Sequence, residues 1–151
     1  MTNRFQIDDI TVYDNQTGLM WTRDAAISDL PMTWAEALAY VSEMNSAGLA
    51  GYQDWHLPNR RELFSLIDHS RITPAVAGGD LFENIFHGYY WTSTTCARVP
   101  SQAWYVHLGG AKVYRGMKYA SYLVWPVRVE SEPATVFKTG QQGCFDAVGQ
   151  R

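Results

Sequence analysis

Two cysteines and four histidines are the side chains of this sequence best suited to nucleophilic, redox or metal chemistry. The cysteines, Cys96 and Cys144, lie far apart, and neither belongs to a C-x-x-C motif. The histidines have no i, i+4 pair of the kind that places two zinc ligands on one helix face; they are His56, His69, His87 and His107. We therefore expect no metal centre. A structural disulfide and two unpaired thiols are both compatible with the cysteine pattern.

Signatures of hydrolases and of calcium-dependent lectins are also absent from the sequence. It has no G-x-S-x-G elbow that would expose a nucleophilic serine. The lectin triplets Glu-Pro-Asn and Trp-Asn-Asp are missing, and Leu57-Pro58-Asn59 is instead typical of a helix N-cap. The aspartates at 8, 9 and 14 are interpreted as solvated turn carboxylates rather than as calcium ligands. We predict neither catalysis nor a bound cofactor.

The segment from Asn84 to Val129 contains no aspartate or glutamate and is rich in tyrosine, arginine and lysine. Aromatic rings offer large contact areas at low entropic cost, and basic side chains bind anionic groups. The predicted ligand-binding residues are Arg98, Tyr105, His107, Lys112, Tyr114, Arg115, Lys118, Tyr119 and Tyr122. Such a surface suits a sulfated or acidic glycan, a glycosaminoglycan-like polymer, or a surface protein. Alternatively, the aromatic rings pack in the core of a small sheet and the cations are solvated at its rim.

The N-terminal half of the chain must supply the scaffold for this segment. Two short β-prone runs, Thr11–Tyr13 and Leu19–Trp21, flank an Asp/Asn/Gly cluster and predict a hairpin. An amphipathic helix is predicted to begin after Thr33, which forms a capping-box pattern with Glu36. Gly48 is expected to end this helix.

A second helix is predicted to begin at Asn59, which has Glu62 in the capping-box position. The side chains that it would bury are Leu63, Leu66 and Ile67. From residue 70 to residue 86 the chain contains Pro74 and Gly78-Gly79 and shows no regular period. We expect this stretch to be irregular.

The C-terminal half changes to the period of β-strands. Four β-prone runs follow one another: Tyr89–Thr94, Ala103–Leu108, Ala111–Arg115 and Leu123–Val129. Gly109-Gly110 predicts a two-residue hairpin turn, and Pro126 favours an edge or a bulge for the last strand. Helices early and antiparallel strands late predict an α+β domain over residues 1–129. The polar stretch 130–151 is interpreted as a tail or linker, or as the start of a further module.

The strand over Ala103–Leu108 alternates between two kinds of side chain. Trp104, Val106 and Leu108 are predicted to face the core. Tyr105 and His107 would then face outward, toward a ligand. The binding prediction depends on this alternation.

The chain has 151 residues, of which 46% are hydrophobic, 14% aromatic and 18% charged, and a net charge of −3. This length favours one domain, and the aromatic content excludes a disordered chain. The acidic balance argues against a nucleic-acid or anionic-membrane binder. The sequence has neither a membrane-spanning apolar run nor a secretory signal. The protein is therefore expected either to be cytoplasmic or to be made with a leader that this sequence lacks.

Several blocks of the sequence occur in the order found in a known domain family. They are TVYDNQTGLMWT (residues 11–22), TWAEALAYV (33–41), GYQDWHLPNRRELFSLID (51–68), YYWTSTT (89–95), AWYVHLGG (103–110) and LVWPVRV (123–129). Over about residues 5–129 the sequence resembles the C-terminal domain family of the Legionella collagen-like adhesin. It departs from the family at His56 and Asn59, where Arg and Thr are usual, and at Leu123-Val124-Trp125, which replaces a Val-Arg.

The resemblance implies a C-type-lectin-like fold with two helices and a twisted antiparallel sheet. Proteins of related fold include formylglycine-generating enzymes and the receptor domains of diversity-generating retroelements. The resemblance also implies a secreted or surface-displayed module, which in some members binds sulfated polysaccharide. We therefore predict a non-enzymatic binding and adhesion module.

Two alternatives to a glycan-binding module stay open. One is a protein-recognising receptor domain of the retroelement type. The other, from a different class, is an enzyme of the formylglycine-generating type, whose chemistry needs an accessible pair of reactive cysteines. Cys96 in a predicted loop and Cys144 in the predicted tail do not favour that chemistry.

Overall fold

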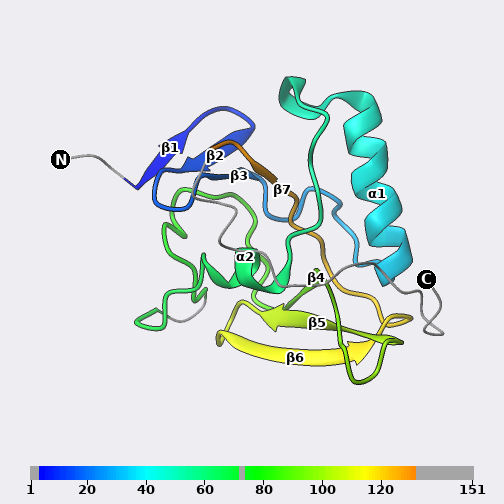
Figure 1. Cartoon of the computed structure of the whole chain (residues 1–151). Helices are drawn as coiled ribbons and strands as arrows, with labels where there is room; N and C mark the ends of the chain where they lie inside the picture. The colour runs from blue at the N-terminus through cyan, green and yellow to red at the C-terminus, as the bar shows by residue number, and fades with distance from the viewer. Residues whose placement is uncertain (1–3, 72–73, 132–151) are drawn as a thin grey trace.

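The strands of the computed structural model, which describes residues 4–71 and 74–131, form two antiparallel sheets. The four-stranded sheet has the order β1 (Phe5–Ile7), β2 (Thr11–Asp14), β3 (Leu19–Thr22), β7 (Val127–Val129). The three-stranded sheet has the order β4 (Tyr89–Thr95), β5 (Gln102–His107), β6 (Lys112–Met117). Figure 1 shows the two sheets at opposite ends of the molecule, with α2 between them and α1 along one side. The predicted α+β class is confirmed, with two sheets in place of one.

The predicted N-terminal hairpin is present as β2 and β3, with Val12 paired to Trp21. Gly18 in its loop has a φ of +78°, a conformation that side-chain-bearing residues rarely adopt. A Cβ atom at this position would also lie 2.1 Å from the Ser131 carbonyl oxygen, and the Ser131 N–H donates to the Gly18 carbonyl. The glycine therefore lets the segment after β7 close over the hairpin.

Helix α1 (Trp34–Ala47) begins and ends where its capping residues predict. The Glu36 N–H donates to the Thr33 hydroxyl, and the Thr33 N–H donates to the Glu36 carboxylate, which completes the capping box. Gly48 follows the helix in the left-handed conformation, with φ of 69°. The buried side chains of α1 are Trp34, Ala37, Val41 and Met44. A 3₁₀ turn, η1 (Leu49–Gly51), follows directly.

Helix α2 (Arg60–Phe64) begins at its predicted N-cap but is shorter than predicted. Asn59 and Glu62 form the expected capping box. The Ser65 hydroxyl donates to the Glu62 carbonyl, and the Ser65 N–H is shared between carbonyl groups, so the helix tightens and ends. Leu66 is still buried, but from the turn after the helix.

The connection between β5 and β6 differs from the predicted two-residue turn. The last cross-strand pair is His107 with Lys112, so four residues, 108–111, make the turn. The Ala111 N–H closes it by donating to the His107 carbonyl, and Ala111 itself has a φ of 61°. The Gly109 and Gly110 N–H groups donate to His107 Nδ1 at 3.1 and 3.2 Å. Leu108, the first residue of the turn, is also held by its backbone, since its N–H donates to the Gly88 carbonyl and its carbonyl accepts from the Ala75 N–H.

The chain crosses from the three-stranded to the four-stranded sheet between residues 118 and 127. Leu123 forms a parallel bridge with Tyr90 of β4. Val127 forms an antiparallel bridge with His56, on the side of β7 that is not paired with β3. The predicted strand over Leu123–Val129 is therefore regular only after Pro126, since a proline has no N–H for a ladder.

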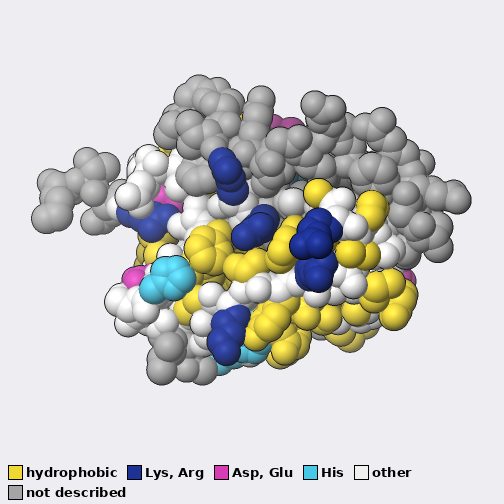
Figure 2. Space-filling model, turned by 60° about the horizontal axis from the view of Figure 1, so that its bottom comes forward, with side chains coloured by type: hydrophobic (Ala, Val, Ile, Leu, Met, Phe, Trp, Pro, Cys, Tyr) yellow, Lys and Arg dark blue, Asp and Glu magenta, His cyan; other side chains and the backbone are white. Residues whose placement is uncertain are grey.

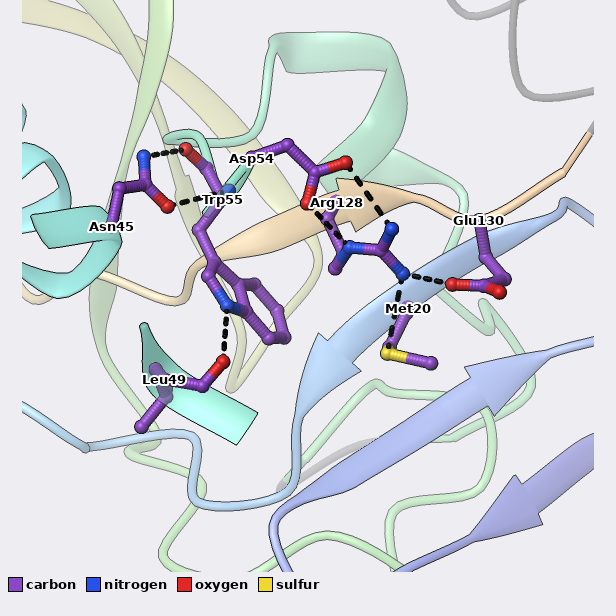
Figure 3. Close-up of polar contacts among 7 residues, drawn as sticks. All are labelled: Met20, Asn45, Leu49, Asp54, Trp55, Arg128 and Glu130. Carbon is purple, nitrogen blue, oxygen red and sulfur yellow. Dashed lines mark hydrogen bonds and ion pairs between the residues drawn. The ribbon is translucent and has the colours of Figure 1, made fainter. Parts of the chain in front are cut away.

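Arg128 of β7 holds the loop that precedes α2. Its Nε donates to Asp54 Oδ1 at 2.6 Å, and its Nη2 donates to Asp54 Oδ2 at 3.2 Å (Figure 3). Its Nη1 pairs with Glu130 and contacts the sulfur of Met20, and the guanidinium carbon lies 3.7 Å from the centre of the Tyr52 ring. These contacts fix one side of the loop that precedes α2 against the four-stranded sheet.

On its other side the same loop is fixed to α1. Asn45 Nδ2 donates to the Trp55 carbonyl at 2.7 Å, and the Trp55 N–H donates to Asn45 Oδ1 at 2.7 Å (Figure 3). The Trp55 indole N–H donates to the Leu49 carbonyl. The loop thus enters α2 from a fixed position, which matters because α2 carries one residue of the candidate site.

Two hydrophobic clusters form the core, and the three-stranded sheet lies between them. One cluster includes Val12, Trp21, Leu63, Tyr90, Val106 and Trp125. The other includes Met20, Trp34, Trp55, Trp91, Ala103 and Val124. Neighbouring residues of β4 therefore point into different clusters, and the same holds along β5. Five tryptophans are buried, whereas Trp104 is half-buried.

Candidate ligand-binding surface on the three-stranded sheet

The alternation along β4, β5 and β6 sorts the predicted binding residues onto two faces of the sheet. The side chains that share the face of Trp91 are Tyr89, Tyr105, His107, Lys112 and Tyr114. Trp104 and Arg115 are cross-strand partners on the opposite face, together with Val106 and Val113. The side chains alternate between the two faces as predicted, but Trp104, predicted to face the core, is half-buried beside Arg60 and belongs to neither core cluster, whereas Tyr105 packs against one of them. The predicted residues therefore do not form one continuous face.

Four tyrosines on the first face, Tyr89, Tyr105, Tyr114 and Tyr122, form what we call the tyrosine cluster. Tyr105 lies at its centre, with its ring centroid 4.4 Å from that of Tyr122, 5.3 Å from that of Tyr89 and 5.5 Å from that of Tyr114. Trp91 forms its base, 4.6 Å from Tyr122. Tyr89 and Tyr114 are 39% and 37% exposed. The cluster is therefore anchored in the core and open to solvent.

Gly116 of β6 makes room for the central ring of the cluster. A Cβ atom at this position would lie 2.7 Å from Cε1 of Tyr105. The Tyr105 ring can therefore lie across β6 and stack on Tyr114, with an angle of 24° between the ring planes. A larger residue at position 116 would displace the ring.

The hydroxyl groups of the tyrosine cluster lie close enough to affect one another. Burial raises the pKa of Tyr105 to about 12, and a hydrogen bond with the Tyr122 hydroxyl adds to this effect. The nearby hydroxyls of Tyr89 and Tyr114 raise the pKa of Tyr105 further. The Tyr105 phenol is therefore neutral at physiological pH, so its hydroxyl keeps its proton.

On the opposite face, two arginines lie beside Trp104 and a third is exposed in the loop between β4 and β5. We call Arg60, Arg98 and Arg115 the arginine patch. The Arg60 guanidinium, from α2, lies 4.4 Å from the centre of the Trp104 ring. Arg115 is the cross-strand partner of Trp104, and Arg98 is exposed in the loop between β4 and β5. Within residues 4–71 and 74–131, none of these arginines forms a salt bridge.

Cys96 lies beneath the arginine patch. Burial raises the pKa of its thiol, but the hydrogen bond from Arg115 and those from the backbone of Val99 and Arg98 outweigh it and leave the pKa below its usual value. The side chain itself is buried. Cys144, its possible disulfide partner, lies outside the described residues, so the pairing of the two cysteines stays open.

Lys118 was predicted to belong to the binding surface, and that prediction is wrong. Its side chain is only 1% exposed. Its Nζ lies 3.0 Å from the Thr95 hydroxyl and 3.9 Å from the centre of the Trp34 ring. The chain turns beneath α1 directly after β6, and the Trp34 N–H donates to the Lys118 carbonyl. This turn carries the lysine into the interior, which no pattern in the sequence indicates.

The remaining predicted residues lie at the margins of these two groups. Tyr119 is 68% exposed, and among the described ring contacts it has none with the tyrosine cluster. Lys112 is exposed beside His107, whose ring centroid lies 4.8 Å from that of Tyr89. His107 and Lys112 therefore border the tyrosine cluster, whereas Tyr119 stands apart.

The structure adds two residues that the sequence prediction did not include. Tyr89 belongs to the tyrosine cluster, and its two-residue spacing from Trp91 could have identified it. Arg60 belongs to the arginine patch because α2 packs against β4 and β5. That packing is a tertiary contact, so no local pattern signals it.

Figure 2 shows how the charges are distributed over the face that carries β5 and β6. Lys and Arg side chains alternate there with hydrophobic and aromatic ones, and the acidic side chains in view lie at the margin. The sequence explains this arrangement, because residues 84–129 contain no aspartate or glutamate. The surface is suited to bind an anionic ligand that also offers apolar contact.

His56 and Asn59 meet at the buried carboxylate of Glu62. His56 Nε2 lies 2.9 Å from Glu62, and the Asn59 N–H donates to the same carboxylate at 2.8 Å. This arrangement fixes the start of α2 and therefore Arg60. Within the described part of the chain, no group of three or more His, Cys, Asp or Glu side chains is placed to hold a metal ion.

Most of the chain matches one known domain family. The model of one family, described as the Lcl C-terminal domain, matches residues 10–128. No curated protein matches the chain. The matched range includes both helices, the three-stranded sheet and both groups of candidate binding residues, whereas β1 of the four-stranded sheet lies before it. No helix within the described ranges is both long and apolar enough to cross a membrane.

Proposed function

The chain belongs to the Lcl C-terminal domain family, and from this premise we propose that it is a non-enzymatic adhesion module that binds a sulfated or otherwise acidic glycan. The glycan is held at the three-stranded sheet, by the tyrosine cluster on one face and by the arginine patch on the other. We further propose that the module is displayed at the cell surface or secreted. The family match supports the adhesive role, and the composition of the sheet surface supports the ligand.

The observation that carries the proposal is an anchored, half-exposed tyrosine cluster on one face of the sheet and, on the opposite face, arginines that form no salt bridge within the described residues. The rings of Tyr89 and Tyr114 offer flat apolar area to the C–H face of a sugar, and the tyrosine hydroxyls add hydrogen bonds. Arginine binds sulfate and carboxylate groups through parallel N–H donors. Because Arg60 is stacked on Trp104, its guanidinium is held in place before a ligand arrives.

The environment of Cys96 supports a function without catalysis. Its thiol is 2% exposed and receives a hydrogen bond from Arg115. A nucleophilic or redox cysteine needs a thiolate that a substrate can reach. Cys96 instead acts as an acceptor that orients Arg115 within the patch.

Binding to immobilised heparin and fucoidan tests the proposal, and two neighbouring arginines of α2 provide a matched pair of variants. Arg60 stacks on Trp104, whereas Arg61 is exposed one position later, about 100° around the helix. We expect R60Q to weaken binding about fivefold to tenfold and R61Q to leave it near the native level. Y114A is expected to weaken binding similarly.

The proposal fails if neither polymer binds, or if R60Q and R61Q have equal effects. If the native chain binds a surface protein but neither heparin nor fucoidan, the result would favour a receptor domain of the retroelement type. Native circular dichroism of each variant is the control for folding.

A further inference from the structure

His107 holds the turn between β5 and β6 through its side chain. Its Nδ1 accepts hydrogen bonds from the Gly109 N–H at 3.1 Å and the Gly110 N–H at 3.2 Å. Its ring forms a T-shaped contact with the ring of Tyr89, with 4.8 Å between centroids and 77° between ring planes. One imidazole therefore joins the hairpin turn to an exposed member of the tyrosine cluster.

The two glycine donors dictate the protonation state of this imidazole. A backbone N–H only donates, so Nδ1 must offer its lone pair and the ring proton must sit on Nε2. In the charged form both ring nitrogens carry protons, and Nδ1 can then accept from neither Gly109 nor Gly110. Protonation of His107 would thus remove the acceptor that the turn uses.

The groups around His107 offer no compensation for a positive charge. Lys112 of β6 is its cross-strand partner, Tyr89 of β4 packs against its ring, and the loop before β4 carries His87 close to the turn. Within the described residues, no salt bridge joins His107 to a carboxylate. The added charge would therefore face a lysine and the ring of Tyr89.

We propose that His107 is a positioning residue that makes glycan binding at the tyrosine cluster dependent on pH. The neutral ring holds the turn and Tyr89 in the binding arrangement, and protonation releases both. The inference rests on the proposed function, since it concerns the same surface. One extra charge would itself attract an anionic glycan, so the proposal requires that the displacement of Tyr89 and Lys112 on loss of the turn bonds outweighs that attraction.

Two substitutions at position 107 distinguish the role of the Nδ1 acceptor from that of the aromatic ring. Asparagine at position 107 keeps an acceptor, because its side-chain carbonyl can accept a hydrogen bond from the N–H of residue 109. Its side chain carries no titratable group. Phenylalanine keeps a ring against Tyr89 but has no acceptor. The variants are therefore H107N and H107F, with H87N as a control for a histidine outside the turn.

Amide NMR of the free protein tests the turn without any ligand. As the pH falls from about 8 to about 5, the range in which histidines change charge, the Gly109 and Gly110 amide protons of the native chain should move upfield in one transition. The same signals should stay constant in H107N and resemble the acidic form at both pH values in H107F. The proposal is overturned if the native signals do not move, if H107N moves equally, or if H87N abolishes the transition.

Heparin binding at constant ionic strength then tests the consequence. Native affinity should fall about fivefold between about pH 8 and pH 5.5, and H107N should lose that dependence. Tighter native binding at the lower pH would overturn the proposal. An absence of heparin binding at pH 8 would contradict the proposed function instead, while the NMR transition would still decide the role of His107 in the turn.

Discussion

At the scale of single residues, the buried lysine shows how context decides what a charged side chain does. Lys118 has an ammonium group over the Trp34 ring and beside the Thr95 hydroxyl, and its alkyl chain fills space between α1 and the three-stranded sheet. Burying a cation is costly, but an aromatic face and a hydroxyl oxygen reduce that cost. Its role is therefore to pack the interior, and it has no part in binding the glycan.

Substitution of Lys118 should change stability and leave glycan binding unaffected. Lys118→Ala is expected to lower the free energy of unfolding by about 2 kcal/mol, because it leaves a cavity beneath α1. Lys118→Met keeps most of the volume and should cost less than about 1 kcal/mol. Urea unfolding measures both values. Weaker heparin binding by the folded Met variant would return Lys118 to the binding surface.

The Asp54–Arg128 pair should make stability depend on pH in the acidic range. The hydrogen bond from Arg128 lowers the pKa of Asp54 in the folded state, despite the opposing effect of partial burial. A group with a depressed folded pKa contributes stability above its unfolded pKa, and that contribution is lost as the pH falls through the folded value. The loss should therefore begin below about pH 4.

Urea unfolding of the native chain and of Asp54→Asn between about pH 7 and pH 3 checks this expectation. The variant should be less stable at pH 7, and its stability should fall less steeply on acidification. Asp54 is 58% exposed, so water screens the pair and the difference should be modest. Parallel pH profiles for the two proteins would show that Asp54 does not contribute.

At the scale of elements, α2 places Arg60 over Trp104 although the helix is only 5 residues long. So short a helix has little stability of its own, and its capping box must hold its first turn. Asn59 supplies the side-chain acceptor for this box, and buried Glu62 supplies the reciprocal acceptor. The arginine patch therefore depends on a helix cap.

Asn59→Ala should lower the free energy of unfolding by about 1 kcal/mol and weaken heparin binding together with it, because Arg60 loses its support. Asn59→Thr should stay within a few tenths of a kcal/mol of the native chain because it keeps a capping oxygen. Urea unfolding and heparin binding check the two effects. If Asn59→Ala loses stability but binds heparin normally, the helix cap does not position Arg60.

Local patterns predicted the elements well where caps and alternation are strong. The boundaries of α1 follow from Thr33 and Gly48, and the alternation of β5 follows from the spacing of its side chains. The length of the β5–β6 turn did not follow, because a histidine side chain, rather than the backbone, accepts the glycine donors. The end of α2 at Ser65 likewise depends on one hydroxyl that bonds back to the helix.

The candidate site was predictable in composition but not in arrangement. An acid-free, tyrosine-rich segment indicated a binding surface, and strand alternation placed Tyr105 and His107 on one face. The placement of Arg60 and the burial of Lys118 both result from packing between segments distant in sequence. Such contacts leave no periodic signal in one chain.

At the scale of the whole molecule, binding of an anionic polymer must overcome an unfavourable net charge of −3. Long-range attraction therefore cannot account for binding, and local contacts at the three-stranded sheet must supply it. These contacts are of two kinds: ring contacts at the tyrosine cluster, which salt hardly affects, and ion pairs at the arginine patch, which salt weakens.

The affinity for heparin should therefore decrease with salt without vanishing. We expect a loss of about tenfold between about 0.05 and 0.3 M NaCl, since a few arginines are neutralised. R115Q should reduce this dependence, while Y114A should lower the affinity at every salt concentration alike. Isothermal titration over the salt series provides the measurement. An affinity that does not change with salt would contradict any role for the arginine patch.

The most direct test of the central claim is to map a heparin hexasaccharide onto the ¹⁵N-labelled protein by amide and indole chemical shifts. The account predicts perturbations at Trp104, Tyr105, Tyr114 and Arg115, on β5 and β6, with α1 and the hairpin of β2 and β3 unaffected. Perturbations confined to α1 or to the four-stranded sheet, or the absence of any perturbation at saturating hexasaccharide, would contradict it.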